Sequence, residues 1–277
     1  MNRRRVVILG ASGNALDILD IIDALGAPWE AAGVLDDRRD KGSKFADLPI
    51  VGSLAEAAAL ADVVFINGIA SERTHRRKLG IIAGTGLDAA RFITLIHPLA
   101  AVSRRAAIGN GSCIGPGCAV SGQVEIGDHS WLGSHAVIGH ECVLGAGVTV
   151  APSATLAGGV TLGAQAYVGT GAMLRPGITV GEGALIGMGA VVLRDVPAGM
   201  VVVGNPARHT AQPDPRLRLE RRRLQPPPRD LRLERRRWAN RRQPGFCASA
   251  RSKPPSNANG QSHTRIRARP GRVERWL

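Results

Sequence analysis

A six-residue repeat fills the middle of this chain and restricts the folds it can adopt. Cut every six residues from Ile108, the sequence begins IGNGSC, IGPGCA, VSGQVE, IGDHSW, LGSHAV, IGHECV and continues in the same register to VLRDVP. Every unit starts with Ile, Leu or Val, its fifth residue is small or β-branched, and its second is usually Gly. Two further units, IHPLAA and VSRRAA, extend the pattern back to Ile96.

So short a period indicates a parallel β-helix, whose stacked coils bury one large aliphatic and one small side chain on each side. Glycine-containing turns provide the corners, where the backbone needs freedom in φ. A flexible glycine-rich linker would not place an aliphatic residue at every sixth position. The composition agrees, because 35 glycines and 3% aromatic residues favour a narrow core of small and branched side chains.

Residues 1–95 show a different pattern, in which strands and helices alternate. Short apolar strands are predicted at 5–10, 31–37, 62–68 and 91–96, and helices at 12–26, 53–61 and 71–86. This order predicts a parallel sheet with crossover helices. At about 95 residues the segment is half of a dinucleotide-binding fold. We therefore expect a Rossmann-like mononucleotide-binding domain at 1–95 and an all-β domain at 96–209.

Residues 210–277 form an Arg- and Pro-rich tail for which we predict disorder. Residues 211–277 hold 19 Lys and Arg against 5 Asp and Glu, whose difference accounts for the whole net charge of +14. The rest of the chain holds 17 of each sign, so its charge does not suggest nucleic-acid binding. The tail is either an anion-binding arm or a solvated extension without a role, and we favour the extension.

Two features of the sequence favour a cytoplasmic protein. The chain has no apolar run long enough to span a membrane. The apolar run after MNRRR is short and passes straight into a glycine turn, which favours a first strand in a cytoplasmic protein over a signal peptide. The four cysteines fit no close-spaced metal pattern, so we expect free thiols and no metal site: Cys113, Cys118, Cys142 and Cys247.

The ensemble of motifs resembles the NeuD/PglD-type sugar acyltransferases, which are hexapeptide-repeat proteins with a left-handed β-helix. The resemblance covers residues 5–209 and rests on GASG, LDD, HP, the hexads and GNPAR, in that order. It implies acetyl-CoA as donor and a sugar or nucleotide sugar as acceptor, of the UDP-amino sugar or sialic acid type. It also implies a homotrimer with active sites between neighbouring β-helices.

His140 and Glu141 match the catalytic histidine of that family and the acid beside it. Direct acyl transfer needs a base for the proton of the attacking amine or hydroxyl, and an imidazole next to a carboxylate serves near neutral pH. On spacing alone, His140 could equally be a corner residue that faces solvent. We treat His129 and His135 as bystanders. Cys142 occupies a fifth hexad position, which predicts core packing and not a nucleophile.

For acetyl-CoA, the resemblance points to a groove lined by Gly158, Thr170 and Met188. Arg194 or Arg208 would meet a CoA phosphate. The chain departs from the family at two places. Gly133 stands where relatives often have Asn, and Thr149 stands where some have a His close to the thioester. Thr149 is therefore a donor contact whose chemistry differs from that of the relatives.

For the acceptor, a loop between strand and helix and two acids after the second strand suggest a nucleotide site, because helix N-termini bind phosphate and acids bind ribose or base. The glycine pattern alone is weak, since it lacks the middle Gly of the dinucleotide motif. The resemblance implies that a uridine nucleotide sugar contacts six residues: Ser12, Gly13, Asn14, Asp36, Asp37 and Gly52. The alternative is a scaffold domain that binds no nucleotide.

Two function classes follow. The first is an acetyl-CoA-dependent sugar N- or O-acetyltransferase, in which His140 acts as general base. The second is a non-catalytic trimer whose β-helix only presents a sugar-binding domain. The His-Glu pair favours the first class, whereas Gly133 and Thr149 give the second some support.

Overall fold

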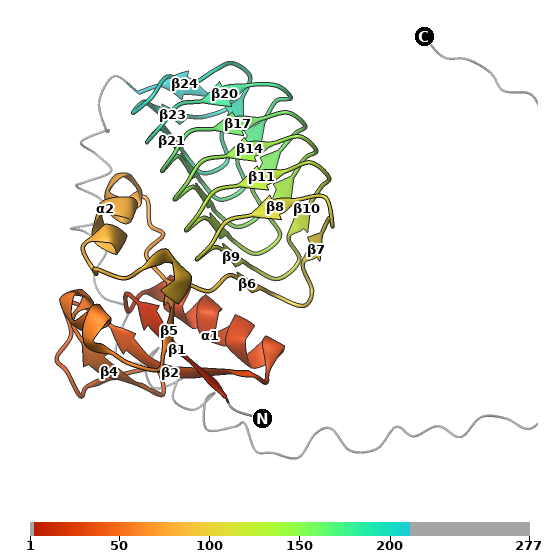
Figure 1. Ribbon diagram of the computed structural model, residues 1–277. Coiled ribbons are helices and arrows are strands. Elements are labelled where there is room, and N and C mark those ends of the chain that lie inside the picture. The colour runs from red at the N-terminus through yellow and green to blue at the C-terminus, as the bar shows by residue number, and fades with distance from the viewer. Residues whose placement is uncertain (1–2, 211–277) are drawn as a thin grey trace, which may run out of the picture. The chain divides into compact units, whose positions relative to one another are not determined.

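The computed structural model describes residues 3–210, and the predictions made for the tail and for Cys247 lie outside this range. An N-terminal lobe holds a five-stranded sheet (Figure 1). Four of its strands are parallel and the first is antiparallel to its neighbour. In spatial order they are β3 (Lys44–Phe45), β4 (Leu48–Gly52), β2 (Trp29–Leu35), β1 (Arg4–Leu9) and β5 (Val64–Asn67). The predicted parallel sheet is thus confirmed.

Helix α1 (Gly13–Leu25) is the helix that the sequence predicted best. Its buried residues Ala15, Ile18, Ile21 and Ile22 recur at helical spacing and pack on the sheet. The predicted helix at 53–61 is instead a 3-10 helix, η1 (Leu54–Ala59), which begins at a Ser53–Glu56 capping box. The N-terminal lobe therefore has a single long helix within the described residues.

Two predictions for residues 71–96 are confirmed only in part. The helix expected at 71–86 is reduced to a 3-10 turn, η2 (His75–Arg77), and α2 (Lys78–Ala83), because residues in this stretch bond to the β-helix instead of lying along the sheet. A further turn, η3 (Ala89–Arg91), follows. The strand expected at 91–96 is divided: Phe92 forms a single parallel bridge to Phe65 of β5, and β6 (Leu95–Ile96) pairs with the β-helix strand β9 (Cys113–Ile114).

From β6 onward the chain forms a left-handed parallel β-helix, as predicted, with successive coils stacked along its axis (Figure 1). Strands that pair between coils lie 18 residues apart, so each coil consists of three hexads. Each coil thus adds one strand to each of three faces, which we number in chain order. The domain boundaries at 95/96 and 209/210 stay predictions.

The first face consists of β6 and of β9 (Cys113–Ile114), β12 (Trp131–Leu132), β15 (Thr149–Val150), β18 (Tyr167–Val168), β21 (Leu185–Ile186), β23 (Val201–Val203) and the antiparallel β24 (Arg208–His209). The second consists of β7 (Ala101–Val102), β10 (Ala119–Val120), β13 (Val137–Ile138), β16 (Thr155–Leu156), β19 (Met173–Leu174) and β22 (Val191–Val192). The third consists of β8 (Ala107–Ile108), β11 (Glu125–Ile126), β14 (Val143–Leu144), β17 (Thr161–Leu162) and β20 (Thr179–Val180).

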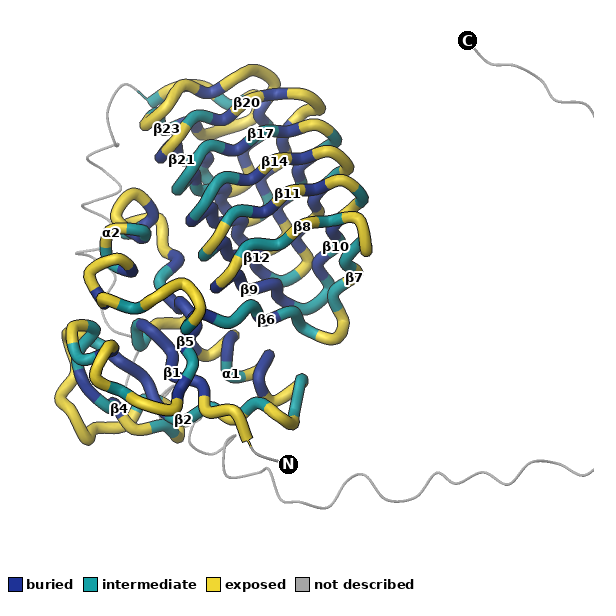
Figure 2. The backbone as a smooth tube through the Cα atoms, in the orientation of Figure 1, coloured by how far each residue is buried: buried dark blue, intermediate teal, exposed yellow. Residues whose placement is uncertain are grey.

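From β6 to β22, each strand joins the sixth residue of one hexad to the first residue of the next. The first and fifth residues of the hexads point inward, as Ile138 and Cys142 do with no exposed surface. The corner turns between the strands are largely exposed, whereas much of the strand backbone between them is buried (Figure 2). The predicted pairing of one large and one small buried side chain per side is confirmed.

The corners use glycine for two different reasons. At the second hexad position the limit is space, because a Cβ on Gly139 would lie 2.6 Å from backbone atoms of the next coil. At the fourth position the limit is conformation, and here non-glycine residues are accepted: Glu141 adopts φ 59°. The sequence interpretation, which attributed all corner glycines to φ freedom, was therefore incomplete.

The faces differ in what covers them. On the first face the outward side chains of Cys113, Trp131 and Thr149 are buried, and the first two join the apolar cluster of α1. On the second face Val137 and Met173 are 39% and 56% exposed. Within residues 3–210 no helix is long and apolar enough to cross a membrane.

Candidate active site

His140 and Glu141 lie at the second corner, where the chain passes from β13 on the second face to β14 on the third. The Nδ1 atom of His140 lies 2.8 Å from Oε2 of Glu141, and both side chains are mostly exposed. Because an ionised carboxylate only accepts hydrogen bonds, Nδ1–H is the donor. The lone pair is then on Nε2, so this pair can accept a proton at Nε2 while the carboxylate stabilises the imidazolium.

Gly158 lies directly against the imidazole of His140. It occupies the same corner one coil further on, and the backbone N–H of Gly159 donates to the carbonyl of His140 at 2.8 Å. A Cβ on Gly158 would lie 2.5 Å from Cε1 and 2.6 Å from Nε2 of His140. The structure therefore brings together two residues that the sequence assigned separately, and the missing side chain leaves Nε2 accessible.

Thr170 and Met188 lie at the first corner, on the other edge of the second face. Their turns belong to neighbouring coils, and the N–H of Gly189 donates to the carbonyl of Thr170 at 2.9 Å. Both side chains are exposed, Met188 by 77%. The predicted donor contacts therefore flank one exposed face, with Gly158 on one edge and Thr170 and Met188 on the other.

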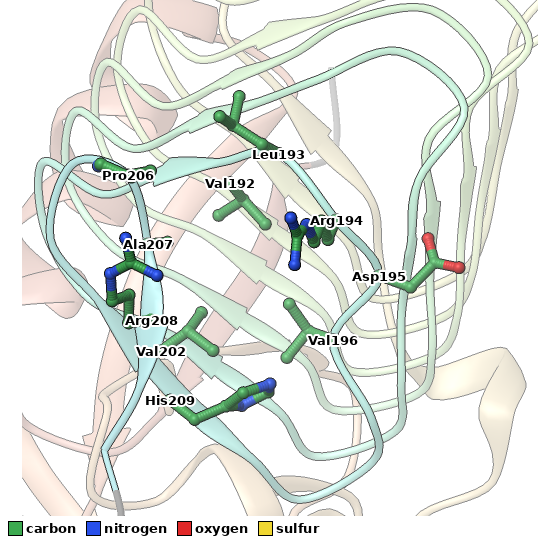
Figure 3. Close-up of a pocket in the computed structure, with 10 residues that line it drawn as sticks. All are labelled: Val192, Leu193, Arg194, Asp195, Val196, Val202, Pro206, Ala207, Arg208 and His209. Carbon is green, nitrogen blue, oxygen red and sulfur yellow. The ribbon is translucent and has the colours of Figure 1, made fainter.

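Arg194 and Arg208 both line a pocket of about 280 Å³ at the C-terminal end of the β-helix (Figure 3). Its apolar lining includes Val192, Val196 and Val202. His209 also lines this pocket and was missed from the sequence, since it follows the GNPAR motif without belonging to it. Two guanidinium groups next to an apolar surface can bind an anionic group that carries a flat or apolar moiety.

Thr149 lies elsewhere, and the predicted contact with acetyl-CoA does not fit its position. It belongs to β15 on the first face, only 1% of its surface is exposed, and its Oγ1 accepts a hydrogen bond from Lys78 Nζ at 2.8 Å. Its hydroxyl is thus buried and hydrogen-bonded to a residue of the N-terminal lobe. The residue that replaces a histidine of some relatives serves an internal contact here.

Lys78 was not predicted, because nothing in the local sequence marks it as buried. Its side chain has no exposed surface, and Nζ also donates to the carbonyls of His129 and Val148 at 3.4 Å each. Burial lowers the pKa of Lys78 to about 7. His129 packs edge-on against Phe92 with ring centres 4.6 Å apart, so this histidine is structural, in agreement with its assignment as a bystander.

The loop before α1 brings together three of the predicted acceptor-binding residues. The hydroxyl of Ser12 and the amide of Asn14 both donate to the carbonyl of Gly68, at 3.1 and 3.3 Å. Gly13 is the first residue of α1, so its N–H belongs to the helix turn that lacks intrahelical acceptors. The loop is therefore held against the end of β5, with the helix N-terminus free to meet an anion.

The other three predicted residues lie at the ends of β2 and β4. Asp36 accepts hydrogen bonds from the N–H of Ala11 at 2.8 Å and of Arg38 at 2.9 Å. Asp37 accepts from the N–H of Leu54 at 2.8 Å. Gly52 is covered by the carboxylate of Glu56, so a Cβ there would collide with it. The six residues thus converge on the carboxyl edge of the sheet, where ligands bind in open α/β folds.

The cysteines of the β-helix are core residues. Cys113, Cys118 and Cys142 are buried free thiols. Cys142 donates its S–H to the carbonyl of Ala157 at 3.2 Å, and burial raises the pKa of its thiol. The structure thus supports core packing for Cys142. Among residues 3–210 there is no group of three His, Cys, Asp or Glu side chains placed to hold a metal ion.

Comparison with known proteins identifies both parts of the chain. The PglD N-terminal domain matches residues 5–79, and the bacterial transferase hexapeptide (six repeats) matches residues 123–158. A curated relative, UDP-N-acetylbacillosamine N-acetyltransferase from Bacillus subtilis (strain 168), is 33% identical over 112 residues. That alignment covers 39% of this chain and half the length of the relative.

Two solved structures match over their whole length or nearly so. The acetyltransferase domain of PglB from Neisseria gonorrhoeae FA1090, in complex with acetyl coenzyme A, is 32% identical with a TM-score of 0.67 and covers 76% of this chain and 100% of its own. A histidine variant of perosamine N-acetyltransferase from Caulobacter crescentus, in complex with CoA and GDP-perosamine, is 31% identical with a TM-score of 0.66, at 75% and 97% coverage.

Both structures share the fold described above, and both bear the name of an acetyltransferase. The resemblance and the enzyme class predicted from the sequence are confirmed at the level of the family. With an N-terminal PglD domain, a left-handed β-helix and relatives above 30% identity over their full length, this chain belongs to the PglD-type family of hexapeptide-repeat sugar acyltransferases.

Proposed function

We propose that this protein transfers the acetyl group of acetyl-CoA to the amino group of a nucleotide-linked sugar, with His140 as general base. The observation that carries the proposal is the corner geometry: His140 is oriented by Glu141 through Nδ1, and Gly158 leaves Nε2 accessible. The named relatives that act on or bind nucleotide sugars support an amine as acceptor over a hydroxyl.

The reaction follows from this geometry. The lone pair of the acceptor's amino nitrogen forms the bond to the thioester carbon, and Nε2 of His140 removes a proton from that nitrogen. The tetrahedral intermediate then collapses, the carbon–sulfur bond breaks, and the CoA thiolate takes up the proton from the imidazolium. Glu141 stabilises the positive charge that the imidazole carries between these two steps. No covalent enzyme intermediate is needed, and Cys142 is buried in the core.

For the donor, we propose that acetyl-CoA lies along the second face. Gly158, Thr170 and Met188 line the two edges of this face, and Val137 and Met173 lie exposed on it. The pocket of Arg194 and Arg208 at the end of the β-helix provides cations for a CoA phosphate. Thr149 is not part of this proposal. Use of acetyl-CoA also supports the cytoplasmic location expected from the sequence.

For the acceptor, we propose that the nucleoside end binds the carboxyl edge of the lobe sheet. Ser12, Gly13 and Asn14 surround the N-terminus of α1, and Asp36 and Asp37 follow β2. The relatives include one enzyme named for a UDP sugar and one solved with a GDP sugar. Candidate acceptors for this protein should therefore include both uridine- and guanosine-linked sugars.

We propose a homotrimer in which the second face is covered by a neighbouring subunit. Val137 and Met173 expose apolar surface in line on this face, and Leu193 and Met188 beside it are 45% and 77% exposed. Thr155 lies between Val137 and Met173 on this face, and exposed large apolar side chains grouped in this way favour an interface. Light scattering at micromolar concentration should give three times the chain mass, and a monomer would refute the shared site.

The test of the proposed function is thiol release from acetyl-CoA with a panel of UDP- and GDP-linked amino sugars and sialic acid. With the best acceptor, His140→Ala should lower kcat by about 10²–10⁴ while KM for acetyl-CoA stays nearly constant, because a corner substitution leaves the inward aliphatic side chains in place. Glu141→Gln should cost less than His140→Ala and shift the acidic limb of the pH–rate profile downward.

His135→Ala is the matched control, since His135 occupies a first-corner turn and should retain most of the activity. Full activity in His140→Ala with none in His135→Ala would show that the wrong histidine has been assigned. No thiol release with any acceptor would support the alternative of a non-catalytic trimer that presents a sugar-binding domain.

A further inference from the structure

The second corner continues below His140 to a pair of arginines. The turns of successive coils stack here through backbone hydrogen bonds: Gln123 N–H to Arg105 carbonyl at 3.2 Å, and Glu141 N–H to Gly122 carbonyl at 3.1 Å. At the third hexad position, one coil apart each time, the corner holds Arg104, Gly122 and His140. Arg105 follows Arg104 at the fourth position.

The distance between the arginines and the base suits one sugar unit. Paired parallel strands lie about 4.8 Å apart, so the two coils between Arg104 and His140 separate their backbones by about 10 Å. Gly122 lies between them without a side chain, and a Cβ there would meet only Ser103 Oγ at 3.7 Å. The surface between the guanidinium groups and His140 is therefore open, about the size of a hexose that carries a phosphate.

The guanidinium groups of both arginines are available to bind an anion. Both are exposed, and within residues 3–210 neither guanidinium group has a hydrogen bond or ion pair. Arg105 donates only its backbone N–H, to Ser103 Oγ at 3.2 Å. The carboxylate at this corner, Glu141, is bonded to His140. Two consecutive arginines without counter-ions among residues 3–210 offer more donors than one carboxylate can accept, and a phosphate has three or more acceptor oxygens.

We propose that Arg104 and Arg105 bind the sugar-bearing phosphate of the acceptor and thereby hold the amino group against His140. This inference rests on the proposed function and adds to it an anionic contact at the sugar end of the substrate. The donor is assigned to the opposite side of His140, from Gly158 toward Arg194. The pair therefore sets a requirement for a phosphate-linked acceptor over a free amino sugar.

The experiment uses the full chain and the variants Arg104→Gln, Arg105→Gln and the double variant. Removal of each guanidinium–phosphate hydrogen bond should raise KM for the nucleotide-linked amino sugar roughly ten-fold, with kcat changed by less than about three-fold. KM for acetyl-CoA and KM for the same amino sugar without its nucleotide should stay unchanged. Replacement of both arginines by Lys should restore part of the affinity. Arg5→Gln, an exposed position on β1, controls for net charge.

Isothermal calorimetry with the nucleotide-linked sugar measures the same interaction without turnover. Weaker binding by the double variant upholds the inference even if no acetyl transfer is found, which separates it from the proposed function. An unchanged affinity and KM in the double variant would overturn it. A rise in KM for acetyl-CoA would assign the pair to the donor, and an equal rise for the free amino sugar would exclude the phosphate, so either result also overturns it.

Discussion

Lys78 gives the sharpest physical prediction. Its side chain has no exposed surface and, among residues 3–210, no carboxylate partner, so its burial should affect how the free energy of unfolding depends on pH. Its Nζ bonds to Thr149 Oγ1 at 2.8 Å and to two backbone carbonyls. These acceptors are neutral, so they replace only part of the hydration that the ammonium loses on folding. Burial accordingly lowers the pKa of Lys78 from 10.5 to about 7.

Proton linkage gives the direction in which the free energy of unfolding changes with pH. Between about pH 7 and 10.5 the unfolded chain keeps the proton on Lys78 while the folded chain releases it, so the unfolded state binds more protons and stability rises with pH. Below pH 7 both states are protonated, and the contribution of this group becomes constant. At 1.36 kcal/mol per pKa unit, the free energy of unfolding gains about 2 kcal/mol between pH 7 and 9 from Lys78 alone.

Urea unfolding of the full chain and of Lys78→Met at pH 7, 8 and 9 measures this term. The difference in unfolding free energy between wild type and variant should move in favour of the wild type by about 2 kcal/mol over that range. The hydrogen bonds that the variant cannot form shift its stability by a constant amount, so they do not affect the slope. Lys44→Met, at an exposed position on β3, should follow the wild type.

Parallel pH dependences of wild type and Lys78→Met would refute the reasoning, since they would mean that Nζ keeps its charge and its hydration in the folded state. His129 beside Lys78 does not account for the expected slope, because burial lowers the pKa of His129 and so moves its titration away from the alkaline range. Direct NMR titration of the Lys78 side chain should give a midpoint near pH 7.

Three further outcomes are expected. Gly158→Ala should lower kcat by at least ten-fold without loss of melting temperature, because the new Cβ displaces the exposed imidazole of His140; an unchanged kcat would show that the ring need not lie there. Asp36→Ala should weaken nucleotide-sugar binding in calorimetry, and no binding by the wild type at millimolar concentration would make the lobe a scaffold. A chain that stops after Thr210, and so keeps β24, should keep its melting temperature and oligomeric state, and loss of either would show that the tail is structural.

The β-helix could be predicted in detail because its contacts are periodic in the chain. A residue's place in the hexad decides whether it points inward, as for Ile138 and Cys142, and the same place 18 residues away decides what it stacks on. His140 and Gly158 are 18 residues apart, so the repeat itself places them on neighbouring coils. The acceptor loop could also be predicted, because Ser12 and Asn14 are close in sequence and belong to one strand–helix turn.

Contacts between the N-terminal lobe and the β-helix were not predictable in this way. Lys78 bonds to a residue 71 positions away, and Arg76 donates to the carbonyls of Gly183 and Gly199. Such contacts have no period, and they accompany the shortening of the helix that local propensity favoured at 71–86 to η2 and α2. They also explain Thr149, which the family resemblance suggested as an acetyl-CoA contact but whose hydroxyl accepts a hydrogen bond from the buried Lys78.

The same geometry explains why the chemistry lies at the corners. Inward positions cannot vary without disturbing a filled core, as the absence of exposed surface at Ile138 and Cys142 shows. At the second corner the third and fourth hexad positions carry side chains outside the core, so a residue there can be replaced without disturbing the core provided that the fourth position accepts its backbone conformation. His140 and Glu141 occupy these two positions in one coil, and Arg104 and Arg105 occupy them two coils earlier. A β-helix thus offers columns of exposed positions at fixed spacing, so a base, an open glycine and an anion-binding pair can be placed in line without any change to the core that holds them.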